Sequence, residues 1–106
     1  MRSRWTASIL RQIRGLAAQR KVCFTLKAFH ELGRLGMGLD EEDACDVLAN
    51  LTPSDLVGRL VSEKTGEWMY VFKPFLGEIV VYVKVVLRGD CVVISFHEER
   101  ETDESE

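Results

Sequence analysis

The sequence lacks the motifs that mark the common catalytic and metal sites. It contains no glycine-rich phosphate loop, no GxSxG elbow for a nucleophilic serine and no HExxH zinc motif. Its two histidines, His30 and His97, lie far apart in the chain, and no predicted element gathers histidines, cysteines and acids. These absences argue against a metal centre. We therefore expect chemistry that needs neither a metal nor a cofactor.

Cysteines and long apolar runs are also scarce. The three cysteines form an odd set at wide spacings without a CxxC motif: Cys23, Cys45 and Cys91. This usage favours reduced thiols in a cytoplasmic protein over a disulfide framework. The longest aliphatic run, residues 79–87, is broken by Tyr82 and Lys84 and is too short to span a bilayer. No signal peptide is evident, so we expect a cytoplasmic protein without membrane contact.

The charges are segregated along the chain. Every charged residue among the first 22 is basic, whereas the segment after His97 is acidic except for Arg100. The basic start could contact a phosphate backbone or an acidic protein, and a solvated helix is the plain alternative. With 106 residues the chain suits one modest core. We predict a single domain over residues 1–97 and a disordered acidic tail over 98–106.

Apolar periodicity places helices in the first half of the chain and strands in the second. A first helix is predicted over 8–18, a second from Thr25 to about Leu35, and a third after Asp40. The second helix should turn Leu26, Phe29 and either Leu32 or Leu35 inward. Strands are predicted at 22–24, 56–61, 67–73, 78–87 and 91–97. The expected fold is α+β, with the helices packed on one face of an antiparallel sheet.

The last two strands predict a hairpin with two different faces. Gly89-Asp90 is a two-residue turn signal. The register that it sets pairs apolar residues on one face, Leu87 with Val92, Val85 with Ile94 and Val83 with Phe96. It also pairs Lys84 with Ser95 and Tyr82 with His97 on the other face. The strand over 67–73 should turn Trp68, Tyr70 and Phe72 to the core. Met69 and Lys73 then join the polar face.

This polar face carries groups that could cleave RNA. Cleavage needs a base for the 2′-hydroxyl, an acid for the leaving 5′-oxygen and positive charge on the phosphate. A histidine such as His97 exchanges protons near neutral pH. Tyr82 could hydrogen-bond the phosphate or assist proton transfer, and Lys84 and Lys73 could neutralise developing charge. An ordinary solvated sheet face is an equally weighted alternative.

Four segments in order resemble the MqsR family of bacterial toxins, in the RelE-like ribonuclease group. They are LGMGLDEEDACDVLANLTPSDL, W-x-x-V-F-K-P, V-Y-V-K and V-V-I-S-F-H-E, and the likeness covers roughly residues 9–99. The resemblance implies a RelE-like toxin fold and an mRNA interferase, a metal-independent endoribonuclease that leaves a 2′,3′-cyclic phosphate. It also implies a cognate antitoxin, a DNA-binding repressor encoded beside the toxin.

The family's residues carry over at three positions and depart at two. Its tyrosine before x-K falls on Tyr82, its basic residue before proline on Lys73, and its basic residue after S-F on His97. A family lysine after S-D-x-x is replaced by Gly58, beside Arg59. A family glutamine after the tryptophan is replaced by Met69. The catalytic candidates are therefore His97, Tyr82, Lys73 and Lys84, and the RNA-binding candidates are Arg59, Met69, Ser95 and Arg88.

Other functions stay open at the level of sequence. The chain could be a non-catalytic α+β module that binds protein or RNA, or a degenerate toxin that retains only antitoxin binding. Residues 25–48 also resemble a related group of small toxin domains with a helix-borne histidine near F-H-E-L. That resemblance would give His30 a role, whereas its position beside Phe29 favours a structural one.

Overall fold

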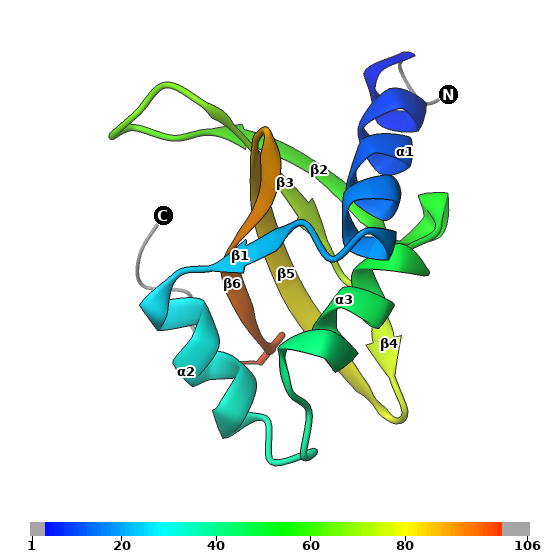
Figure 1. Cartoon of the computed structure of the whole chain (residues 1–106), viewed down its shortest axis with the longest axis vertical. Coiled ribbons are helices and arrows are strands. Elements are labelled where there is room, and N and C mark those ends of the chain that lie inside the picture. Colours follow the sequence, from blue (N-terminus) through cyan, green and yellow to red (C-terminus); the bar gives the residue numbers. More distant parts are fainter. Residues whose placement is uncertain (1–3, 101–106) are drawn as a thin grey trace.

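The computed structural model describes residues 4–100, and within them three helices accompany one six-stranded sheet (Figure 1). The helices are α1 (Arg4–Ala18), α2 (Leu26–Arg34) and α3 (Glu41–Ala49), and a short 3₁₀ turn spans Pro53–Asp55. The strands are β1 (Val22–Phe24), β2 (Leu56–Val61), β3 (Trp68–Phe72), β4 (Phe75–Leu76), β5 (Ile79–Arg88) and β6 (Asp90–Glu98). The prediction for the tail falls on residues that, from 101 onward, lie outside this described part.

The sheet has the strand order β1-β6-β5-β3-β2, and β4 adds a short ladder to β5. The α+β class is confirmed. The expectation of a wholly antiparallel sheet was wrong at one edge, because β1 runs parallel to β6. β1 precedes α2 and α3, and the long connection through them allows a parallel return.

The face of the sheet that packs against α1 and α3 forms the hydrophobic core. We call it the core face, and it carries Tyr70, Phe72, Val83 and Phe96. Ile13 and Ala17 of α1 and Leu48 of α3 pack on it and are fully buried. Trp68 does not reach this core, and 43% of its surface stays exposed. The inward placement predicted for Trp68 was therefore wrong, whereas those of Tyr70 and Phe72 are confirmed.

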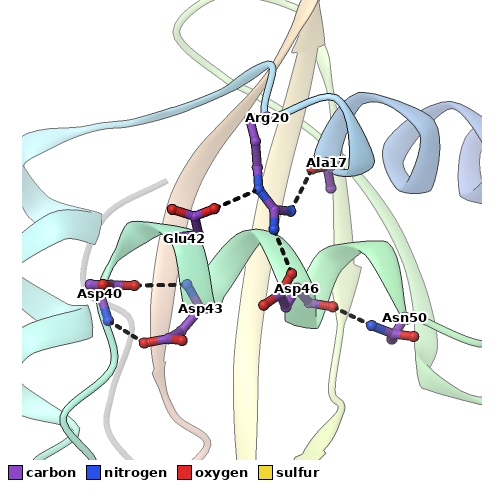
Figure 2. A network of polar contacts seen from close by, with 7 residues as sticks. All are labelled: Ala17, Arg20, Asp40, Glu42, Asp43, Asp46 and Asn50. Carbon is purple, nitrogen blue, oxygen red and sulfur yellow. Dashed lines mark hydrogen bonds and ion pairs between the residues drawn. The ribbon is translucent and has the colours of Figure 1, made fainter.

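Arg20 links α1 to α3 through polar contacts. Arg20 follows the end of α1 with a positive φ of 60°, and its guanidinium donates hydrogen bonds to the Ala17 carbonyl, Glu42 and Asp46 (Figure 2). The start of α3 is closed by a capping box in which Asp40 and Asp43 bond each other's backbone N–H, also in Figure 2. The predicted cap at Asp40 is confirmed.

Helix α2 lies apart from α1 and α3, beside the end of β6 (Figure 1). The predicted inward placement was wrong for Leu26 and Phe29, which are 72% and 49% exposed, and is confirmed for Leu32, which is 2% exposed. The other buried residues of α2 are Ala28 and Glu31. Ala28 and Leu32 join the hydrophobic core, while Glu31 meets the edge of β6, where backbone groups need polar partners.

The β5–β6 hairpin follows the predicted register in only one half. Tyr82 pairs with His97, Val83 with Phe96 and Lys84 with Ser95, as expected. Nearer the turn, however, Val85 pairs with Val93, Leu87 with Cys91 and Arg88 with Asp90. The predicted pairs of Leu87 with Val92 and of Val85 with Ile94 were wrong.

A β-bulge separates the two halves of the hairpin. The register shifts beside Lys84 and Val85, so that Ile94 is an extra residue in β6. At the turn, Gly89 alone separates the paired Arg88 and Asp90, and its φ of 88° suits glycine. The bulge reverses the alternation of β6, so the buried core residues near the turn are Cys91 and Val93.

Candidate active site

The face of the sheet opposite the core face gathers most of the predicted catalytic residues, and we call it the site face. One row of cross-strand partners runs across it from Gly58 through Val71 and Lys84 to Ser95. Directly paired residues point to the same side of a sheet. Tyr82 and His97 form the next pair on this side.

Tyr82 and His97 form a stacked pair of rings. Their centroids are 5.1 Å apart and the ring planes differ by 15°. His97 is 2% exposed, and the half-buried Tyr82 ring lies against it. Within β6, the His97 Nδ1 atom is 2.7 Å from the carbonyl oxygen of Glu98. A carbonyl oxygen can only accept, so this contact assigns the proton to Nδ1 and leaves the lone pair of the neutral ring on Nε2.

Three polar residues of the site face are buried, namely Lys84, Ser95 and His97. Lys84 is 3% exposed and Ser95 is fully buried. Lys84 extends along the strand pair, with its ammonium 6.0 Å from the centre of the Tyr82 ring. The predicted alternative of an ordinary solvated face was wrong at these three residues, His97 included. A buried ammonium, hydroxyl and imidazole on one sheet face are uncommon in a purely structural surface.

A second lysine, not foreseen from the sequence, reaches the same place from α2. Lys27 donates hydrogen bonds from Nζ to Ser95 Oγ at 2.9 Å and to the Ile94 carbonyl at 3.2 Å. It also pairs with Glu31 at 3.2 Å. No local pattern marks Lys27, because its position depends on the parallel pairing of β1 with β6, which brings the start of α2 to this strand.

A comparison with protein families identifies the family of this chain. The sequence model described as "Motility quorum-sensing regulator, toxin of MqsA" matches residues 6–98. The chain belongs to the MqsR toxin family. It is therefore a toxin of a toxin–antitoxin system, and membership implies an antitoxin partner. The comparison with curated proteins found no match for this chain.

The two departures from the MqsR pattern lie on the site face. Gly58 begins the row that ends at Ser95, and Met69 pairs with Leu60 two residues before Val71. Met69 is 3% exposed. The row thus lacks a cation at its β2 end, and the buried thioether of Met69 stands where the resemblance expects an amide.

Arg59 does not compensate for the missing lysine at position 58. It pairs with Tyr70 and so belongs to the core face. Its guanidinium lies between two indole rings, 4.4 Å from the centre of Trp5 and 3.9 Å from that of Trp68. These cation–π contacts tie α1 to the β2–β3 ribbon. The structure does not bring this RNA-binding candidate to His97.

Arg88 also lies away from the stacked pair. It is at the turn end of β5, about 20 Å from Tyr82 at the usual rise of a strand. Its guanidinium holds Glu67 through both carboxylate oxygens, with a shortest distance of 2.6 Å. Hydrogen bonds from Arg88 lower the pKa of Glu67 to about 2. This pair links the residue before β3 to the end of β5.

Lys73 stays close to the site but is engaged by an acid. Its Nζ is 2.9 Å from Glu99 Oε1 in a half-exposed ion pair. The Glu99 backbone N–H donates to the Val80 carbonyl, which places this acid beside the end of β5. Lys73 and Glu99 therefore form a charged pair at the rim of the site face, next to the Tyr82–His97 end.

The remaining reactive groups lie elsewhere. His30 is exposed on α2, where it lines a shallow depression with Phe29 and Asp40. Burial raises the pKa of the Cys91 thiol to about 12, which suits a core residue and not a nucleophile. Among residues 4–100, no three histidines, cysteines or acids are grouped so that they could hold a metal. No helix within that range is long and apolar enough to cross a membrane.

Proposed function

We propose that this toxin is a metal-independent endoribonuclease that cleaves mRNA and so arrests translation and growth. The observation that carries the proposal is the stacked Tyr82–His97 pair beside Lys84 and Ser95 on one sheet face. A base, a phenol, an ammonium and a hydroxyl within one pair of strands are the groups that cleavage at a 2′-hydroxyl requires. Membership in a toxin family supports a target whose loss stops growth.

The proposed reaction is an internal transfer at phosphorus. The Nε2 lone pair of His97 takes the proton of the 2′-hydroxyl, and the freed oxygen attacks the adjacent phosphorus. The bond from phosphorus to the 5′-oxygen breaks, and that oxygen takes a proton from the Tyr82 hydroxyl. The Lys84 ammonium neutralises the charge that develops on the phosphate. The products are a 2′,3′-cyclic phosphate and a 5′-hydroxyl, and water carries the proton gained by His97 back to the Tyr82 phenolate.

The burial of His97 adds a requirement to this scheme. A phosphate cannot reach an imidazole that is 2% exposed while the Tyr82 ring lies against it. We therefore infer that the Tyr82 side chain turns aside when RNA enters. The ring lies over His97 in the free protein and would move its hydroxyl toward the leaving oxygen in the complex.

The test is cleavage of single-stranded RNA by the purified protein in the presence of EDTA. We expect fragments that end in a cyclic phosphate, and we expect His97→Ala and Tyr82→Ala to abolish them. His30→Ala is the matched control, because it removes the other, exposed histidine and should leave cleavage unchanged. RNA that stays intact with correctly folded wild-type protein, with or without Mg²⁺, would refute the proposal.

The degenerate toxin is the second candidate function, and the departures at Gly58 and Met69 favour it. Such a protein would bind its antitoxin tightly and leave RNA intact. We propose that the antitoxin is a DNA-binding repressor encoded beside this gene, and that both proteins act in the cytoplasm. A pull-down with the product of the neighbouring gene distinguishes the degenerate toxin from a non-catalytic module. The degenerate toxin would bind the antitoxin, whereas the module would neither bind the antitoxin nor cleave RNA.

A further inference from the structure

The outer edge of β6 loses its strand partner just before the site. β1 pairs with β6 only as far as Phe24 and Val93, and the Thr25 N–H donates the last bond of this ladder to the Val93 carbonyl. β6 continues to Glu98. The backbone groups of Ile94 and Phe96 that point to this side therefore need other partners.

Two side chains of α2 supply those partners, and the Thr25 hydroxyl adds a longer hydrogen bond of 3.5 Å to the Ile94 carbonyl. Lys27 Nζ donates to the Ile94 carbonyl at 3.2 Å, and Glu31 Oε1 accepts from the Phe96 N–H at 2.9 Å. Lys27 and Glu31 also pair with each other across one helical turn at 3.2 Å. They thus replace the missing strand over three residues of β6. We call them the edge pair.

The acid of the edge pair is buried, whereas 32% of the Lys27 side chain is exposed. Glu31 is only 5% exposed, although it is a carboxylate. A charge in such a place is tolerated because an ammonium and a backbone N–H face its two oxygens, and removing one partner leaves the other charge uncompensated. The arrangement is therefore held in one geometry and resists small shifts of β6 against α2.

The segment held in this way, residues 94–96 of β6, sets the direction in which His97 points. Ile94 is the bulge residue, and Phe96 directly precedes His97. Lys27 additionally donates to Ser95 Oγ at 2.9 Å, on the site face. Because one residue of slip would turn every side chain of a strand to the opposite face, whatever holds the bulge decides where His97 points.

We infer that Lys27 and Glu31 are positioning residues for the catalytic pair, acting by fixing the Ile94 bulge and hence the direction of His97. This inference rests on the proposed function for its kinetic part. A lysine that bound substrate phosphate directly would behave differently, because its loss would weaken RNA binding. The two roles are separated by whether kcat or KM changes.

The experiment uses the full chain and four variants, Lys27→Ala, Lys27→Arg, Glu31→Ala and Glu31→Gln. We expect Lys27→Ala and Glu31→Ala to lower kcat about 10- to 100-fold, the effect of a small misplacement of a catalytic group, with KM within about twofold. Lys27→Arg should restore most of kcat because a guanidinium can still donate to both β6 acceptors. Arg34→Ala, an exposed cation on the same helix, is the control and should match wild type.

A local structural readout accompanies the kinetics. Hydrogen exchange of the Phe96 amide, followed by NMR, should accelerate at least tenfold in Glu31→Ala. It should stay slow in Glu31→Gln, whose amide oxygen can still accept. If Glu31→Ala does not fold, Glu31→Gln still tests the inference. This variant retains the acceptor and the volume of the side chain but loses the ion pair with Lys27, so its kcat should still fall.

The outcomes are distinct. A kcat equal to wild type in Lys27→Ala, a raised KM with unchanged kcat, or an unchanged Phe96 exchange in Glu31→Ala would each overturn the inference. A wild-type protein that does not cleave RNA would remove the proposed function alone. The exchange of the Phe96 amide would then still decide whether the edge pair holds β6.

Discussion

The two faces of the central sheet are both buried, but the site face buries a lysine, a serine and a histidine beside apolar residues such as Met69 and Val71. The core face buries apolar residues such as Phe72 and Phe96, which is favourable by about 25 cal/mol for each Å² removed from water. The site face buries Lys84, Ser95 and His97, whose removal from water costs free energy unless partners replace it. Because burying these polar groups costs stability, their presence on one face indicates that the site face serves a function besides stability. The adjacent residues Phe96 and His97 allow the difference to be tested within one strand.

The largest effect is expected from the site face. His97→Ala should lower the rate of RNA cleavage about 10²- to 10⁴-fold, because a general base is lost. The measurement is the single-turnover rate of cleavage at saturating protein. If this variant cleaved at the wild-type rate, His97 would be a buried structural residue like its neighbour.

The neighbouring residue on the core face should act on stability. Phe96→Ala should lower the free energy of unfolding by about 3–5 kcal/mol, because a fully buried ring leaves a cavity among packed side chains. Urea unfolding followed by circular dichroism measures this. Cleavage by the fraction that remains folded should persist, and a loss below about 1 kcal/mol would contradict the assignment of Phe96 to the core.

A substitution at Lys84 tests fold stability and RNA cleavage separately. Lys84→Met keeps a long side chain on the site face but removes the buried charge. We expect cleavage reduced at least about tenfold, because the charge that neutralises the phosphate is lost while the length of the side chain is kept. Thermal melting and the cleavage rate are compared on the same samples. A marked loss of stability would show that Lys84 serves the fold.

Gly58 tests whether the row across the site face binds RNA. A Cβ added at Gly58 meets no atom within 4 Å, so Gly58→Lys should fold normally. If the row follows the phosphate backbone, the added cation should lower KM about two- to fivefold, as expected for an exposed charge pair of about 0.5–1 kcal/mol. Val57→Lys is the control, because it places the same charge on the neighbouring bulge residue, which is 59% exposed. An equal change in both variants would point to a nonspecific effect of charge.

The smallest effect concerns the exposed pair of Glu67 and Arg88. The pKa of Glu67 is lowered from 4.5 to about 2, so the pair contributes stability above about pH 4.5, and this contribution disappears as the pH falls toward 2. Melting temperatures of wild type and Arg88→Ala, measured from pH 6 to pH 2, should differ slightly at the upper end and converge at the lower end. A difference that grew as the pH fell would contradict the pairing.

Much of the local structure was accessible from the sequence. The helix that begins after Asp40 and the cap at Thr25 depend on residues close in the chain, and the structure confirms them. The pairing of Tyr82 with His97 is also confirmed, but the turn contains Gly89 alone, and the extra residue Ile94 restores the predicted register. The membership in the MqsR family was likewise predicted from ordered motifs and is confirmed over residues 6–98. The activity and its residues stay predictions.

Other features were decided only by contacts between distant parts of the chain. The inward face of α2 and the position of Lys27 depend on β1 ending beside the middle of β6, and the bulge at Ile94 offsets the one-residue turn at Gly89. Arg59 was misplaced for a similar reason, since a bulge in β2 sets which of Gly58 and Arg59 turns to the site face. Periodicity reports which side chains alternate, because that follows from the backbone geometry of one segment. It does not report where an extra residue is inserted or which edge is left open, because the partner strands and helices determine both.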